Sequence, residues 1–159
     1  MKMENIRIEA QVSYEYKQMF GQLHTIKHNR FCYDGKKKVE LFNVVADSER
    51  FGENEIMYQG PFKDCVAYLA REGYDYKAIV LEQNRGRDIQ ITHRMFRIIS
   101  QVGAVLHLQG RAGQEMDIST DDLIPVAPYT FRLPENPFAS PMYRKGSTAS
   151  VKIGPARAW

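Results

Sequence analysis

The regular spacing of apolar residues stops at Leu133, and this break most limits where the chain can build a hydrophobic core. The stretch 133–159 contains four of the seven prolines. Its apolar residues follow neither the period of two typical of strands nor the period of 3.6 typical of helices. We therefore predict a compact domain over 1–132 and an extended arm, containing proline, serine and glycine, over 133–159.

The positive charge of the sequence is concentrated in the same stretch. From Arg132 onward there are five basic residues and one acidic residue, a balance of +4. Since the whole chain carries +3, residues 1–131 are left with −1. A basic arm on a nearly neutral body favours anionic partner surfaces for the arm alone.

Alternating and continuous apolar runs predict a sheet. Residues 6–16 alternate, and Asp34-Gly35 divides 30–46 into the two strands of a hairpin, because glycine supplies the positive φ of a tight turn. The stretch 17–29 fits either a strand interrupted at Gly21 or a short irregular helix. Further strands are predicted at 55–59, 76–83 and 104–110, followed by edge strands near Pro125 and Pro128.

Two helices are predicted between these strands. Gly60-Pro61 opens the first helix and Gly73 ends it. Asp88 is the expected N-cap of the second helix, which covers 89–102. The predicted buried side of that helix consists of Ile91, Met95, Ile98, Ile99 and Val102.

Two helices are too few to cover both faces of a broad sheet. The predicted fold is therefore α+β, a two-layer arrangement in which both α-helices lie on one face of a mixed β-sheet, with the extended C-terminal arm added.

The sequence contains no recognisable catalytic or metal-binding motif, and we predict no catalytic residue, no metal site and no cofactor. His24 and His28 could face one metal ion on a helix, but the sequence indicates no third ligand for it. The serines lack the surroundings of a nucleophile elbow. Cys32 and Cys65 are expected to be small buried thiols.

Isolated titratable residues give no mechanism by themselves. His107 is expected to be a partly buried structural residue, and Glu115 and Asp117 are expected to be solubilising charges near a turn. A small enzyme that assembles a site from His107, Glu82 and Tyr76 stays open as the weaker of two alternative functions.

The stretch 85–97 supports the stronger alternative. It contains four arginines and one acidic residue, and on the predicted second helix part of this charge would form one basic face. Such a face suits a nucleic-acid-binding or regulatory protein, because the guanidinium group binds phosphate oxygens well. The candidate nucleic-acid or anion-binding residues are Arg85, Arg87, Arg94 and Arg97.

The preferred function depends on the arm, which carries apolar residues that a disordered linker usually lacks. The predicted partner-binding residues are Phe138, Met142, Tyr143, Val151, Ile153 and Trp159. Scattered apolar anchors on a soluble spacer favour a non-catalytic assembly or interaction protein that docks partner subunits, its own copies or others, through 133–159. A viral or phage structural or accessory component has this kind of organisation.

The remaining predictions concern location. The first residues lack the apolar core of a signal peptide, and no apolar run reaches the ~20 residues needed to cross a bilayer. We therefore predict cytoplasmic synthesis, with the virion as a further location, and no membrane partner.

Overall fold

The computed structural model describes residues 2–83 and 88–154. The chain forms two compact units, Met1–Glu72 and Gly73–Trp159. The predicted boundary after Arg132 does not coincide with this division. It falls inside the strand Thr130–Leu133, which belongs to the large sheet of the second unit.

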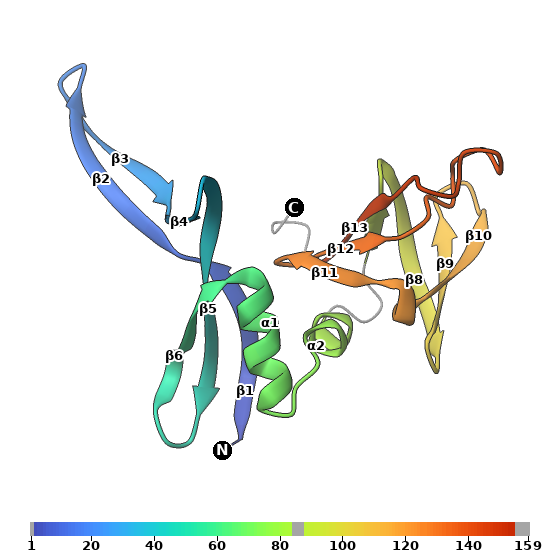
Figure 1. The fold of residues 1–159 in the computed structure, drawn as a ribbon, viewed down its shortest axis with the longest axis horizontal. Helices are drawn as coiled ribbons and strands as arrows, with labels where there is room; N and C mark the ends of the chain where they lie inside the picture. Colours follow the sequence, from blue (N-terminus) through green and yellow to red (C-terminus); the bar gives the residue numbers. More distant parts are fainter. Residues whose placement is uncertain (1, 84–87, 155–159) are drawn as a thin grey trace. The chain divides into compact units, whose positions relative to one another are not determined.

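The first unit is built on β5 (Lys37–Ser48), which is paired along its whole length. Two strands lie along one of its edges: β1 (Met3–Ala10) pairs with its second half and β4 (Phe31–Asp34) with its first half. The other edge carries β6 (Gly52–Pro61), and all these pairings are antiparallel. The hairpin of β2 (Val12–Met19) and β3 (Gln22–Asn29) forms a separate two-stranded sheet (Figure 1).

One helix, α1 (Phe62–Arg71), packs on the four-stranded sheet. Its apolar stripe is buried, and the ring of Phe62 meets that of Phe42 edge-on at 5.6 Å. The rings of Tyr58 and Tyr68 stack at 4.9 Å beside this contact. Gly73 follows the helix with φ +89°, as expected for a glycine C′ residue. The predicted first helix is therefore confirmed.

The second unit begins with α2 (Tyr76–Gln83) and continues as strands. Their bounds are β7 (Asp88–Ile91), β8 (Arg94–Val102), β9 (Val105–Gly110), β10 (Glu115–Ser119), β11 (Ile124–Ala127), β12 (Thr130–Leu133) and β13 (Ala149–Ile153), with the 3-10 turn η1 (Thr120–Asp122) after β10. They form one antiparallel sheet in the order β10-β9-β8-β7-β13-β12-β11. The edge position of Pro125 was predicted correctly, because β11 ends the sheet; Pro128 lies in the turn between β11 and β12.

One face of this sheet is apolar from β8 to β13. Ile89 and Ile91 of β7 and Val151 and Ile153 of β13 are fully buried there, and Phe96 and Ile98 of β8 are nearly so. Helix α2 covers part of this core: Tyr76 stacks on Phe131 at 6.4 Å, and its hydroxyl oxygen accepts a hydrogen bond of 3.1 Å from the backbone N–H of Tyr129.

The predicted α+β fold is wrong: the protein is mainly β, with three sheets, and α1 and α2 do not cover one face of a common sheet. The predicted helix 89–102 is the hairpin β7–β8, turning at Thr92-His93. Ile89, Ile91, Phe96 and Ile98 are buried by strand alternation. Ile99 and Val102, which a helix would have buried, are exposed.

The predicted strand 76–83 is α2. Asp75 begins this helix, because its carboxylate accepts from the N–H of Lys77 at 3.1 Å and its carbonyl accepts from the N–H of Ile79 at 3.0 Å. A short apolar run fits a buried strand or a buried helix equally well. Here the cap formed by Asp75 distinguishes the helix from the strand.

Candidate functional site

The hairpin β2–β3 (residues 12–29) leaves the four-stranded sheet where β1 ends and β4 begins; from here on it alone is called the arm, as distinct from the C-terminal segment 133–159. Three backbone hydrogen bonds of 2.9 Å fix its root: Gln11 N–H to the Leu41 carbonyl, Leu41 N–H to the Arg30 carbonyl, and Arg30 N–H to the Gln11 carbonyl. The amide of Gln11 is buried and donates to the carbonyl of Phe42 at 3.2 Å. The arm is thus an insertion held at its root (Figure 1).

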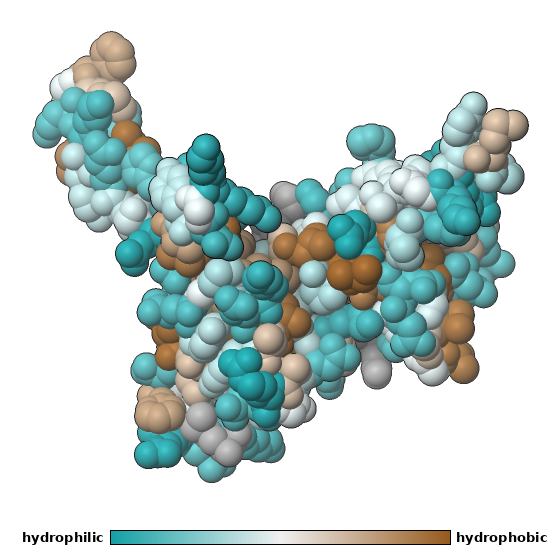
Figure 2. Space-filling model, in the orientation of Figure 1, coloured by the Kyte–Doolittle hydropathy of each residue, from teal (hydrophilic) through white to brown (hydrophobic). Residues whose placement is uncertain are grey.

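Both faces of the arm are largely exposed. Cross-strand pairing places Tyr14 opposite Lys27, Tyr16 opposite Thr25 and Gln18 opposite Leu23. Because paired residues share a face, Tyr14, Tyr16 and Leu23 lie on one face beside Lys27, Thr25 and Gln18, and Figure 2 shows hydrophilic and hydrophobic residues mixed along the arm. Tyr14, Tyr16 and Leu23 are 56 %, 67 % and 64 % exposed. A two-stranded sheet without a further layer is marginally stable in water, so this surface favours contact with another molecule.

The tip of the arm has an unusual residue. Met19 pairs with Gln22, which leaves Phe20-Gly21 as a two-residue turn with φ of +52° and +77°. A turn with two positive φ angles favours Asn-Gly, and a bulky residue at the first position is strained. Phe20 is nevertheless there, and its side chain is fully exposed. Strain and an exposed ring at one position indicate a functional contact.

The neighbouring β4–β5 hairpin extends this surface with charge. Its turn was predicted correctly, with Gly35 at φ +63°. Tyr33 is 72 % exposed, and the Lys38 ammonium lies 4.0 Å from the centre of the Phe31 ring. Residues 12–40 contain six basic and three acidic residues, a balance of +3, whereas the rest of the first unit (2–11 and 41–72) contains five basic and eight acidic residues, a balance of −3.

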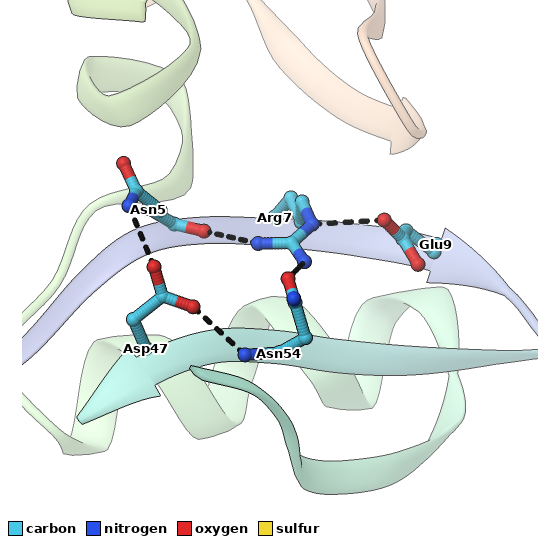
Figure 3. A network of polar contacts seen from close by, with 5 residues as sticks. All are labelled: Asn5, Arg7, Glu9, Asp47 and Asn54. Atoms are coloured by element: carbon cyan, nitrogen blue, oxygen red, sulfur yellow. Dashed lines mark hydrogen bonds and ion pairs between the residues drawn. The ribbon is translucent and has the colours of Figure 1, made fainter. Parts of the chain in front are cut away.

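The far end of β1, β5 and β6 is acidic and is held by a polar network (Figure 3). Asn5 and Asn54 sit at irregularities of β1 and β6 with φ of +52° and +55°. The Asp47 carboxylate accepts from the Asn5 side-chain amide at 2.7 Å and from the Asn54 N–H at 2.8 Å, and the guanidinium of Arg7 donates to the Asn54 side chain and to Glu9. These hydrogen bonds lower the pKa of Asp47, with Arg7 contributing electrostatically.

The predicted C-terminal anchors lie in several environments. Val151 and Ile153 are fully buried in β13, between β7 and β12, so they belong to the core of their own unit. Phe138 is half-buried: its ring stacks on Phe96 at 5.9 Å, and the Arg94 guanidinium lies 4.3 Å from its centre. Met142 and Tyr143 are exposed, by 80 % and 68 %. Trp159 lies outside the described residues.

The helix that was predicted to carry the basic surface is not formed, because its residues belong to β7 and β8. Arg94 and Arg97 lie on strand β8 three positions apart, so their side chains leave opposite faces of the sheet. Arg94 stacks on Phe138, and Arg97 is paired across the ladder with Asp88. Arg85 and Arg87 lie outside the described residues.

The histidines do not form a metal site with one another. His24 and His28 lie four positions apart on β3, a separation of roughly 13 Å along a strand, too far to share one ion. His28 instead faces Glu15 at 3.0 Å. Within 2–83 and 88–154, no group of His, Cys, Asp or Glu could hold a metal ion.

His107 has partners that the sequence reading missed. Strand pairing places it opposite Asp117, and its Nδ1 lies 2.7 Å from the Asp117 carboxylate, with Nε2 3.5 Å from Glu115. The hydrogen bond with Asp117 raises the pKa of His107 most, and Glu115 adds to the effect. The alternation of β9 and β10 around the turn at Gly113 could have revealed this pair.

The residues proposed for a small enzyme lie in different environments. His107 is on the outer side of the β9–β10 hairpin, Tyr76 is buried against Phe131, and Glu82 lines a pocket of about 360 Å³ with Gln101 and Thr120. The thiols do not suggest a nucleophile either. Cys65 is buried, as predicted, and burial raises its pKa to about 11; Cys32 is half-buried.

Comparison with family models, curated proteins and solved structures gives no match. Within the described residues, no helix has both the length and the apolar character required to cross a membrane. The arm is therefore the best-defined candidate site among the described residues. The alternation on both sides of Phe20-Gly21 was its signal in the sequence.

Proposed function

We propose that this protein is a non-catalytic assembly protein that docks partner proteins through the arm, residues 12–29. The observation that carries the proposal is the fully exposed Phe20 on a strained turn, at the end of a hairpin whose tyrosines are also exposed. Exposed aromatic side chains on a hairpin can supply much of the binding energy of an interface.

The chemistry of the arm suits a protein surface better than a phosphate backbone. Its charges nearly cancel, because Lys17 and Lys27 are set against Glu15, and Glu15 also faces His28. Binding dominated by phosphate contacts needs several unpaired cations. An exposed aromatic face with few charges is typical of the centre of a protein interface.

The segment after β12 supports a second docking element. Met142 and Tyr143 are the predicted C-terminal anchors that remain exposed, whereas Val151 and Ile153 stabilise the sheet. The two elements can be compared directly, because each presents an exposed aromatic ring.

The test is site-specific photocrosslinking in cells of the native source. Two single variants carry p-benzoylphenylalanine, one at Phe20 and the other at Tyr143. We expect a discrete protein adduct at position 20 that disappears when Tyr14 and Tyr16 are both replaced by serine. Adducts that form only at position 143 would assign docking to the C-terminal segment. Adducts to nucleic acid, or equal nonspecific adducts at both positions, would contradict the proposal.

A further inference from the structure

The first unit carries two surfaces of opposite charge at opposite ends of the same strands. The arm and the β4–β5 hairpin have a balance of +3 over 12–40, and the rest of the unit has −3. The acidic surface, here called the base, lies where β1 begins and where β5 turns into β6. The base consists of Glu4, Asp47, Glu49, Glu53 and Glu55, with Phe51 and Ile56; Lys2 and Arg50 lie in the same region, and the Arg50 guanidinium is 5.2 Å from the centre of the Phe51 ring.

The base has room for a basic side chain. A pocket of about 240 Å³ is lined by four acidic residues, Glu4, Asp47, Glu49 and Glu53, together with Lys2, Ser48 and Gly52. Lys2 lies 3.7 Å from Glu4, and Asp47 is held by Asn5 and Asn54. Among the residues that the structure describes, Glu49 and Glu53 have no cation within ion-pair distance.

Apolar side chains lie in the same region. Phe51 and Ile56 are 51 % and 53 % exposed, on the β5–β6 turn and on β6. Exposed apolar side chains rimmed by carboxylates match a surface on which exposed aromatic rings lie beside lysines. Tyr14, Tyr16 and Phe20 provide the rings. The charge comes mainly from residues 30–40 beside the root of the arm, where four basic residues stand against two acidic ones.

The arm of a molecule cannot reach the base of the same molecule. The root of the arm is at Gln11, whereas Glu4 at the base lies seven positions earlier on the same strand, roughly 23 Å away. The arm then leads away from the four-stranded sheet (Figure 1). An arm therefore does not occupy the base of its own first unit.

We infer that the partner of the arm is a second copy of this chain, which receives it on the base of its own first unit. The inference rests on the proposed function and names the partner. Because the two surfaces differ, the contact is head-to-tail, and each molecule that receives an arm still offers its own arm. Repetition of such a contact produces a closed ring or an open filament.

The test uses the purified full chain and two variants that each lack one surface. One variant replaces 12–29 by Asn-Gly, and the other carries Glu49→Lys and Glu53→Lys. A matched control carries Asp121→Lys and Asp122→Lys, which reverse two exposed acidic side chains of the second unit. Sedimentation velocity measures the mass of each protein across a concentration series, and circular dichroism checks that each is folded.

We expect the unaltered chain and the control to associate. Their association should weaken about tenfold or more between 0.1 M and 1 M salt, where the screening length falls from about 10 Å to about 3 Å. Each surface variant alone should be monomeric. An equimolar mixture of the two should form a one-to-one dimer, because one protein supplies the arm and the other supplies the base.

Two results would overturn the inference: a mixture that stays monomeric, or surface variants that associate as strongly as the unaltered chain. If the double lysine variant is unfolded, Glu49→Gln with Glu53→Gln takes its place, with the same expected result. A purified chain that stays monomeric while position 20 crosslinks to a different protein would refute self-association and leave the proposed function standing. A purified chain that stays monomeric and also gives no protein crosslink at position 20 would refute both the inference and the proposed function.

Discussion

The backbone N–H of Arg30 donates a hydrogen bond of 2.9 Å to the carbonyl oxygen of Gln11, directly beneath the eighteen residues of the arm. The two positions are thus already paired like the ends of a short hairpin. Replacing 12–29 by Asn-Gly should close the chain with a favoured two-residue turn. We expect the first unit to keep its unfolding midpoint, as measured by thermal denaturation. A cooperative transition that is lost or lowered by more than a few degrees would show that the arm supports the fold.

Phe20→Asn should separate the stability of the arm from its function. Asparagine tolerates positive φ better than phenylalanine, so the turn should become more stable by roughly 1 kcal/mol. Amide hydrogen exchange in β2 and β3 should slow, whereas association through the arm should weaken. The matched control is Tyr143→Asn, which should change neither. Faster exchange in the arm would contradict the strain inferred at Phe20.

Tyr76→Phe should destabilise the second unit. The substitution keeps the ring that packs on Phe131 and removes the hydroxyl that accepts from the Tyr129 N–H. Loss of one buried hydrogen bond should lower the free energy of unfolding by about 1 kcal/mol. Chemical denaturation monitored by fluorescence measures the change. Burial raises the pKa of Tyr76, so the phenol should resist ionisation in the folded protein until well above its usual range.

His107 should make stability depend on pH. Because Asp117 and Glu115 raise its pKa in the folded state, the protonated pair contributes fully below the unfolded value of 6.5. The contribution disappears as the pH rises through the raised folded pKa. NMR titration should show a raised pKa for His107 that falls in Asp117→Asn. His93 provides an internal comparison, and equal titration of His107 in both proteins would refute the interaction.

Asp47→Ala should weaken the junction of β1, β5 and β6, because its carboxylate bonds to residues on both neighbouring strands. The thermal midpoint of the first unit should fall. In the unaltered protein this contribution is present above the unfolded pKa of 3.8 and is lost as the pH decreases through the lower folded value. Asn54→Gly is the comparison, since it keeps the positive φ and the backbone donor to Asp47 and removes only the side-chain acceptor of Arg7. An equal fall of the thermal midpoint in both variants would contradict the role inferred for the Asp47 carboxylate.

The sequence predicted features that local chemistry decides. Pro61 and Gly73 bound α1, Gly35 turns the β4–β5 hairpin, and Pro125 marks an edge strand. Each of these depends on the backbone freedom of one residue, which the sequence states directly. The buried stripe of α1 was likewise readable from its period.

The errors arose where one pattern fits two periods. Ile91, Met95, Ile98 and Val102 satisfy a helical stripe, yet Ile89, Ile91, Phe96 and Ile98 also alternate, and the β-branched side chains fit the strands. The helical face expected for Arg94 and Arg97 is therefore absent. Residues 17–29 were predicted only as one of two alternatives, a strand interrupted at Gly21 or a short irregular helix. The ambiguity arose because both faces of the arm are exposed, so its alternation separates no core from solvent.

The insertion of β13 between β7 and β12 also determines the order of folding events. The first unit has all of its strands and its helix once Arg71 has left the ribosome. The second must wait for Ala149–Ile153, and until then β10-β9-β8-β7 and β12-β11 are separate fragments with unpaired edges at β7 and β12. Nascent chains interrupted in this interval should be substrates for chaperones, because their edges invite aggregation.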